Sequence, residues 1–337
     1  MNTLSKLNPD LAPFKTVKAH NTSASLIILP LLFFALLLAF PEVSRAAVDS
    51  SLQLCAQKLI PSLFPFMVAG ELFFALGAGE TVGRLLGKPF SRLFGISENG
   101  VSAFLLGAVC GLPLGAKYAL SLYKNGEITK SDCEKLMGIS TNAGIGFVVV
   151  GIGVSIYGSV RLGWLLYLCQ IVASSVTGIL LKGDRKTCLT KPVISQKAKN
   201  SFPALFADAV ASSAVSLIKI CGFVIFFGVL SAFTVSASSF FSLPTLIPAT
   251  VISFTELTAA CEILREISLS NSPVIHQSSR ILTFFAVGFA GLSVHMQTAS
   301  FALEHNVGIR KYLLTKLISG VICALLGAAV LHFLPTP

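Results

Sequence analysis

The sequence predicts an all-α polytopic membrane protein with two inverted repeats, each with a re-entrant helical hairpin and a broken transmembrane helix, plus an extra N-terminal transmembrane helix. Three observations support this. Of 337 residues, 54% are hydrophobic and only 12% are charged, whereas soluble domains carry about 25% charged residues. Apolar segments follow one another along the whole chain. Two of them are interrupted, one by Gly and Pro and one by an acid, at corresponding places in the two halves.

Most of the apolar segments approach or exceed the roughly 20 residues that a helix needs to cross a bilayer. The first resembles a signal peptide because a passable cleavage site, "SRAA", follows it at 44–47. An uncleaved helix is favoured, because a long stretch precedes this segment and further spans follow it. The apolar segments are 24–41, 52–78, 99–122, 136–158, 162–181, 204–234, 243–264, 279–303 and 312–333.

Lysine and arginine predict which loops face the cytoplasm. They are concentrated in the N-terminus, in 82–97, in 182–200 and at 310–311. These loops share one side only if two apolar segments enter the membrane and return without crossing it. The segment 99–122 contains "CGLPLGAK" (110–117), and 243–264 contains "FTELT" (254–258), each of which interrupts a helix. Both are therefore predicted to be re-entrant hairpins, and the loops left outside, 42–50, 159–161 and 235–243, are poor in basic residues.

The hairpins belong to an internal repeat whose two halves share a pattern of elements but few identical residues. The tips align as "VCGLPLGAKYAL" over "SFTELTAACEIL", and the following spans align as "NAGIGFVV" over "FAGLSVHM". The first hairpin enters from inside and the second from outside, so the repeat is inverted, as in secondary transporters. The predicted parts are the cytoplasmic N-terminus with the first helix (1–47), the first repeat (48–182), a basic cytoplasmic loop (183–200) and the second repeat (201–337).

Several classes of protein are disfavoured. The net charge of +10 comes without a compact basic patch interleaved with aromatics, so a nucleic-acid partner is not expected and contacts to anionic lipid are. The eight cysteines form no CxxC pair and the five histidines no ligand spacing, so no metal site is expected. The sequence has no phosphate-binding GK[ST] loop, GxSxG elbow or HExxH, which predicts a protein that is not an enzyme and has no cofactor.

Glu256 lies in a long apolar stretch between Thr255 and Thr258. A carboxylate in hydrocarbon is costly, so intramembrane acids are usually functional or paired. One interpretation is that Glu256 contacts substrate or a coupling ion, and the other is a structural salt bridge to Lys117 or Lys219. Lys117 follows the first hairpin tip, where it either attracts an anionic substrate or extends its ammonium to the membrane surface.

The remaining candidates cluster at the predicted breaks. At the first tip, Gly, Pro and Gly shape the turn or allow close packing. At the broken helices, polar residues face an unwound backbone, although Asn142 also suits a helix N-cap and His295 a packing role. The predicted substrate-binding residues are Gly111, Pro113, Gly115, Lys117, Thr141, Asn142, Thr255, Glu256, Thr258, Ser293 and His295.

The order of two hairpins, two broken helices and a Thr-Glu tip resembles the nucleoside-recognition (Gate) domain, which concentrative nucleoside transporters share with several sporulation membrane proteins. A more specific resemblance is to the YlbJ (SpoVV) family of sporulation integral membrane proteins. It rests on "LIPSLFPFMVAGELF" (59–73), "GLPLGAKYALSLYKNGEIT" (111–129) and "STNAGIGFVVVGIG" (140–153). The resemblance implies passage of dipicolinic acid across the outer forespore membrane.

The chain departs from the nucleoside-transporter pattern, in which each hairpin tip reads like G-Q-T-E-A-P. Only "FTELTA" (254–259) keeps the Thr-Glu pair, and the first tip has lost its acid and has Lys117 nearby. This favours an anion, so the expected function is transport of a small carboxylate. An ion-coupled nucleoside or nucleobase carrier and a non-transporting membrane scaffold are the alternatives. The sequence does not decide whether a proton or a sodium ion is coupled to transport. It also does not decide whether the chain forms a homo-oligomer, which the trimeric nucleoside carriers suggest by analogy.

Overall fold

The computed structural model describes residues 24–182 and 201–333, which form helices joined by short connections and contain no strand. The prediction of an all-α fold is confirmed. The basic loop predicted at 183–200 and residues 1–23 of the predicted N-terminal part lie outside the described residues. The chain divides into two units, 1–46 and 47–337, and the second contains every predicted site residue.

Five helical stretches among the described residues are long and apolar enough to cross a membrane: Pro41–Phe73, Val160–Leu180, Phe202–Phe240, Pro273–Glu304 and Arg310–Phe333. A sixth is counted if Gly87–Phe94 and Glu98–Cys110, bent by 92°, form one span. The segment predicted as the first span is helical over its described residues, as α1 (Ala24–Ala39). The continuous helix Pro41–Phe73, which contains most of the next predicted segment, 52–78, is long enough to span.

The first repeat begins with α2 (Pro41–Leu54), η3 (Cys55–Leu59) and α3 (Ile60–Ala75), which run on without a break. The basic stretch 82–97, expected to be a loop, largely forms the helix α4 (Ala78–Phe94). Its basic residues recur every four positions, at 84, 88 and 92, with apolar residues such as Leu85, Leu86 and Phe90 between them. That spacing is typical of an amphipathic helix. Gly95, at φ 63°, ends α4 in the left-handed conformation that glycine accepts without strain.

The first hairpin consists of α5 (Glu98–Cys110) and α6 (Leu114–Lys124), so its tip lies at 111–113, where the sequence predicts it. It is followed by α7 (Lys130–Ser140), an unwound stretch at 141–144, η4 (Gly146–Ile156) and α8 (Val160–Leu180). The predicted broken helix is thus α7 and η4. Pro113 lacks an N–H, and Gly111 adopts φ 80°, which together stop the helix at the tip.

The second repeat has the same order of elements. The long helix α9 (Phe202–Phe240) leads to the hairpin α10 (Leu246–Thr255) and α11 (Leu257–Ile267), which breaks at Glu256. The broken helix is α12 (Pro273–Phe289) and α13 (Gly291–Glu304), interrupted at Ala290 with φ 76°, and α14 (Arg310–Phe333) follows. Only a short connection, 241–245, stands where the first repeat has α4. The opposite orientation of the two repeats stays a prediction.

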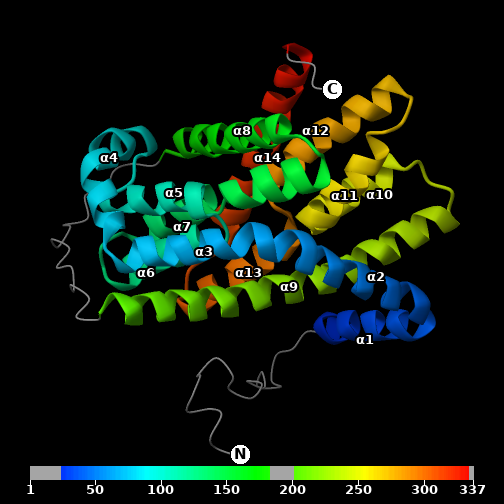
Figure 1. The fold of residues 1–337 in the computed structure, drawn as a ribbon, viewed down its shortest axis with the longest axis horizontal. Helices are drawn as coiled ribbons and strands as arrows, with labels where there is room; N and C mark the ends of the chain where they lie inside the picture. The colour runs from blue at the N-terminus through cyan, green and yellow to red at the C-terminus, as the bar shows by residue number, and fades with distance from the viewer. Residues whose placement is uncertain (1–23, 183–200, 334–337) are drawn as a thin grey trace, which may run out of the picture. The chain divides into compact units, whose positions relative to one another are not determined.

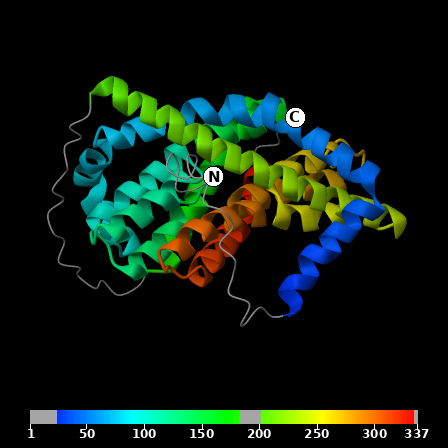
Figure 2. The ribbon, with the colours of Figure 1, turned by 90° about the horizontal axis from the view of Figure 1, so that it is seen from below.

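Packing within the second unit places the breaks near one another. The helices α3 and α9 run side by side, and α14 packs against α12 and α8 (Figures 1 and 2). The half-helix α7 contacts α8 and α14, while α13 contacts α9 and the tip helix α10. One buried apolar cluster draws on both repeats, including Phe147 of η4, Leu257 of α11 and Phe284 of α12.

Candidate functional site

A cavity of about 40 Å³ lies where the helix breaks of both repeats meet. Its polar lining comes mostly from the breaks themselves. Its apolar wall comes from the long helices that precede the hairpins and from η4. The lining residues are Leu59, Leu63, Leu112, Ala143, Gly144, Phe147, Ile220, Val224, Glu256, Leu257, Thr258, Ser293, Val294 and Gln297.

Four helices begin beside this cavity. Leu112 lies two residues before α6, Gly144 two residues before η4, and Leu257 is the first residue of α11. Ser293 lies in the first turn of α13. The first N–H groups of a helix have no partner within the helix and carry a partial positive charge. The cavity is therefore placed to receive an anion or another hydrogen-bond acceptor.

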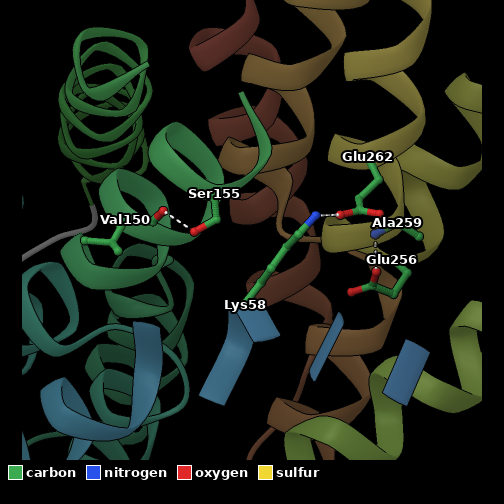
Figure 3. Close-up of polar contacts among 6 residues, drawn as sticks. All are labelled: Lys58, Val150, Ser155, Glu256, Ala259 and Glu262. Carbon is green, nitrogen blue, oxygen red and sulfur yellow. Dashed lines mark hydrogen bonds and ion pairs between the residues drawn. The ribbon is translucent and has the colours of Figure 1, made fainter. Parts of the chain in front are cut away.

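Glu256 already occupies one of these N-termini. Its side chain is 2% exposed, and its Oε2 accepts a hydrogen bond of 2.6 Å from the N–H of Ala259, so it caps α11 (Figure 3). The cap explains how the acid is accommodated among apolar residues, because the helix N-terminus compensates negative charge. Lys117, one predicted salt-bridge partner, donates a hydrogen bond of 2.8 Å to Ser216 on α9 and lies 5.3 Å from the ring centre of Phe301.

The unwound stretch 141–144 is held by polar side chains of α8. Gln170 bonds both backbone groups of one residue: its Nε2 donates to the Ala143 carbonyl at 2.9 Å, and its Oε1 accepts from the Ala143 N–H at 3.2 Å. The side chain of Asn142 donates to the carbonyl of Ile139 and accepts from Ser174 at 2.6 Å. Asn142 therefore bonds back to the end of α7 and is not a helix N-cap, which the sequence left as the alternative to a contact at an unwound backbone.

The glycines of the first hairpin provide close contact between backbones. A Cβ at Gly111 would lie 2.3 Å from the backbone N of Gly144, and one at Gly115 would lie 2.3 Å from the carbonyl oxygen of Ser140. In the second repeat, a Cβ at Gly291 would lie 3.1 Å from the backbone N of Leu257. In each repeat the hairpin tip thus touches the break of the following helix. Gly111 and Gly115 act here through close packing, which the sequence left as the alternative to ligand contact.

Two buried polar atoms of α13, Ser293 Oγ and His295 Nε2, have no hydrogen-bond partner among the described residues. Ser293 lines the cavity and is 1% exposed. A buried hydroxyl without a partner costs about 1–3 kcal/mol, so the hydroxyl of Ser293 is available to a bound molecule. His295 lies away from the cavity lining, with its Nδ1 2.7 Å from the hydroxyl of Tyr312 and its ring edge-on to Phe289.

Of the predicted site residues, Glu256, Thr258 and Ser293 line the cavity together. Thr255 bonds back to the carbonyl of Ile252, and Thr141 bonds back to that of Met137. The cavity lining does not include Gly111, Pro113, Gly115, Lys117, Thr141, Asn142, Thr255 or His295. The prediction missed Gln170 and Lys316, both wholly buried in apolar helices. Polar residues inside a predicted span are the signal that could have found them.

A curated protein matches most of the chain. The sporulation integral membrane protein YlbJ of Bacillus subtilis (strain 168) is 26% identical over 324 residues, which covers 86% of this chain and 78% of YlbJ. The chain is a relative of YlbJ. The resemblance stated from the sequence motifs is confirmed, and YlbJ is described as an integral membrane protein. Together with the candidate spans, this establishes a multi-pass membrane protein.

The similarity to YlbJ extends over both repeats and does not assign a ligand. No family model matches the chain, and no solved structure matches it. Within 24–182 and 201–333, no group of three or more His, Cys, Asp or Glu side chains is arranged to hold a metal ion.

Proposed function

We propose that this chain is a membrane carrier for a small carboxylate, and that its substrate is dipicolinate moved across the outer forespore membrane during sporulation. Similarity to YlbJ, a sporulation integral membrane protein, supports a role in a membrane during sporulation. The family resemblance suggests dipicolinate and a Gate-type architecture. A carrier role without enzymatic chemistry suits a buried cavity formed where helices break.

The single observation that carries the proposal is the set of helix N-termini around one unpartnered hydroxyl. The beginnings of α6, η4 and α13 surround the cavity, and Ser293 Oγ has no partner there. Because Glu256 caps α11 and the first N–H groups of α6 bond to Gly111, the N-termini of η4 and α13 are left for a substrate carboxylate. Dipicolinate carries two carboxylates and so offers an acceptor to each of them.

The size of the cavity implies a conformational cycle. A space of 40 Å³ holds about one water molecule and excludes an aromatic acid. Substrate therefore enters only when the hairpin tips move away from the broken helices. The ion pair between Lys58 on η3 and Glu262 on α11 links the second hairpin to the first repeat beside the cavity (Figure 3). Its separation would accompany opening.

One observation favours a second candidate, a nucleoside or nucleobase carrier. The charged side chain that lines the cavity is an acid, Glu256, and it is accompanied by Thr258 and Gln297. Hydroxyl, amide and carboxylate groups suit an uncharged base or ribose as well as they suit an anion. A membrane scaffold without transport would keep the fold and need no ligand at this cavity.

Flux measurements distinguish the three candidate functions: a carboxylate carrier, a nucleoside or nucleobase carrier, and a scaffold without transport. The full chain is reconstituted in proteoliposomes, and uptake of radiolabelled dipicolinate, uridine and adenine is compared with empty liposomes. The proposal expects saturable dipicolinate uptake and no uptake of the other two. Uptake of uridine or adenine alone would identify the second candidate, and no uptake of any substrate by correctly inserted protein would favour the scaffold.

A pair of serine variants on α13 tests the site itself. Ser293→Ala removes the hydroxyl that faces the cavity, and we expect the KM for dipicolinate to rise about 10- to 150-fold, the value of a hydrogen bond to a charged group. Ser300→Ala is the matched control, because Ser300 is exposed and bonds to the carbonyl of Gln297. Equal KM values for the two variants would contradict the placement of the substrate in this cavity.

A further inference from the structure

Lys316 is a wholly buried lysine that the cavity does not include. It lies on α14, is 0% exposed, and its Nζ donates a hydrogen bond of 2.8 Å to the carbonyl oxygen of Thr141. Thr141 is the C-cap of α7, so this carbonyl belongs to the C-terminal end of a half-helix. Among the residues that the structure describes, no Asp or Glu forms an ion pair with Lys316.

The position is one that attracts a cation. The last carbonyls of a helix carry a partial negative charge of about half an elementary charge. In carriers with broken helices, half-helix C-termini and unwound carbonyls are the groups that coordinate the coupling sodium ion. Here the carbonyl at the end of α7 is already bonded to an amine supplied by the chain.

Among the described residues around Lys316, no carboxylate compensates its charge. His295 on α13 lies within electrostatic range, as does Cys323 on α14 itself. Tyr312, one turn earlier on α14, bonds to His295, and Cys169 of α8 lies near Cys323. Asp132, in the first turn of α7, and Lys135, in its middle, line a cavity separate from the substrate cavity. The ammonium is therefore balanced chiefly by the helix end of α7, and a neutral amine keeps the same hydrogen bond.

Two connections tie this amine to the proposed site and to water. Thr141 lies two residues before Ala143. Ala143 lines the substrate cavity and is held by Gln170. Thr315, the neighbour of Lys316 in the chain, lines a cavity of about 330 Å³ together with Asp132, Lys135 and Lys311. A change of charge on Lys316 thus acts on the backbone that forms the substrate site. Lys316 itself is one residue from Thr315, which lines a space large enough for water.

We propose that Lys316 is the coupling group of the carrier, and that its ammonium takes the place of a sodium ion at the end of α7. Nζ takes a proton from water on one side of the membrane and returns it to water on the other, so the anion moves with a proton. The inference rests on the proposed function, since coupling requires transport.

The first experiment measures dipicolinate uptake by proteoliposomes with and without an inward proton gradient, in sodium or choline medium. Wild type should accumulate dipicolinate with the gradient and be indifferent to sodium. Lys316→Arg keeps the charge and the hydrogen bond but stays protonated, so it should retain exchange and lose accumulation at least tenfold. Lys316→Met should lose the response to pH as well. Accumulation by Lys316→Arg at the wild-type level would overturn the proposal.

Lys124→Met is the matched control. Lys124 also lies at the C-terminal end of a helix, α6, but it is exposed and lines neither cavity. Its variant should accumulate dipicolinate as wild type does. Loss of coupling in Lys124→Met equal to that in Lys316→Met would show that any lysine at a helix end affects transport, and would overturn a specific role for Lys316.

A second experiment does not depend on transport. Thermal unfolding of the purified full chain is followed at constant ionic strength while sodium replaces choline. Lys316→Ser frees the Thr141 carbonyl, so sodium should raise the Tm of this variant and leave that of wild type unchanged, because a ligand that binds only the folded state stabilises it. Any other pattern overturns the proposal. If wild type carries no dipicolinate, the proposed function fails, and this titration still decides whether Lys316 stands in for an ion.

Discussion

The side chain of Gln170 bonds to both the N–H and the carbonyl of Ala143, and so replaces the helical partners that the unwound stretch lacks. Gln170→Leu leaves two buried backbone groups without partners, at about 1–3 kcal/mol each. We therefore expect the free energy of unfolding to fall by roughly 2–6 kcal/mol, measured by thermal or denaturant unfolding in detergent.

Leu168 provides the control for this variant. It lies on the same helix, two residues away, and is exposed at the surface of the described structure. Leu168→Val should change the free energy of unfolding by no more than about 0.5 kcal/mol, as surface substitutions usually do. Equal losses in the two variants would show that α8 is sensitive along its whole length and that the bonds to Ala143 are not special.

The sequence located the breaks better than it located the contacts made at them. Gly111–Pro113 and Glu256 were recognisable because Gly, Pro or an acid in an apolar segment interrupts a helix whatever surrounds it. The cavity was only partly predictable. Its walls come from elements about 200 residues apart, such as Leu59 and Glu256, and their meeting depends on packing between the repeats.

Two site predictions show what a single sequence leaves undetermined. Asn142 was expected to bond at an unwound point or to cap a starting helix. The backbone is unwound at 141–144, and the Asn142 amide bonds to the preceding turn, which decides between the two. Lys117, which follows a hairpin tip, was expected either to attract an anion or to extend its ammonium to the membrane surface. The direction of its side chain depends on the rotation of α6, which places it over Phe301 and against Ser216. Neither outcome follows from local propensity.

Two glycines test the close packing of the first hairpin. A Cβ at Gly107 on α5 would lie 1.9 Å from the carbonyl oxygen of Ser140, whereas one at Gly222 on α9 would meet nothing within 4 Å. Gly107→Ala should destabilise the protein by about 3 kcal/mol or more, because the obstruction is backbone. Gly222→Ala should be neutral or stabilise by up to about 1 kcal/mol, since alanine favours the helix. Equal Tm values would contradict the contact between α5 and the end of α7.

Lys58 and Glu262 form an ion pair between η3 and α11, with side chains 30% and 38% exposed. A double-mutant cycle with Lys58→Met and Glu262→Gln should give a coupling energy of about 1 kcal/mol or less in stability, as expected for partly exposed pairs. If the pair separates when the site opens, each single variant should also speed dipicolinate exchange. Additive effects of the two substitutions on stability would show that the pair contributes no stability.

Two substitutions at Glu256 test whether its hydrogen bond to Ala259 or its negative charge stabilises the N-terminus of α11. Glu256→Gln keeps an oxygen that can accept from the N–H of Ala259, so it should unfold within about 1 kcal/mol of wild type. Glu256→Ala removes the cap of α11 and should cost roughly 0.5–2 kcal/mol. Unfolding in detergent ranks the three proteins. A Gln variant as unstable as the Ala variant would mean that the negative charge at the helix end matters more than the hydrogen bond.

The last prediction concerns the opposite orientation of the two repeats, which follows from the positions of basic residues. The connection after the first hairpin should face the cytoplasm and the connection after the second should face the exterior. Asn125 and Asn271 are exposed residues in these connections, and Asn125 avoids the strained φ of 74° at its neighbour Gly126. Single cysteines at the two positions, in a background with Cys188 and Cys221 replaced, should react with a membrane-impermeant maleimide from opposite sides. The cysteines at 55, 110, 133, 169, 261 and 323 are buried and should react little.

Labelling of both positions from one side would refute the inverted repeat. The shared order of elements would then describe two parallel units, and the convergence of helix N-termini on the cavity would have to arise without symmetry.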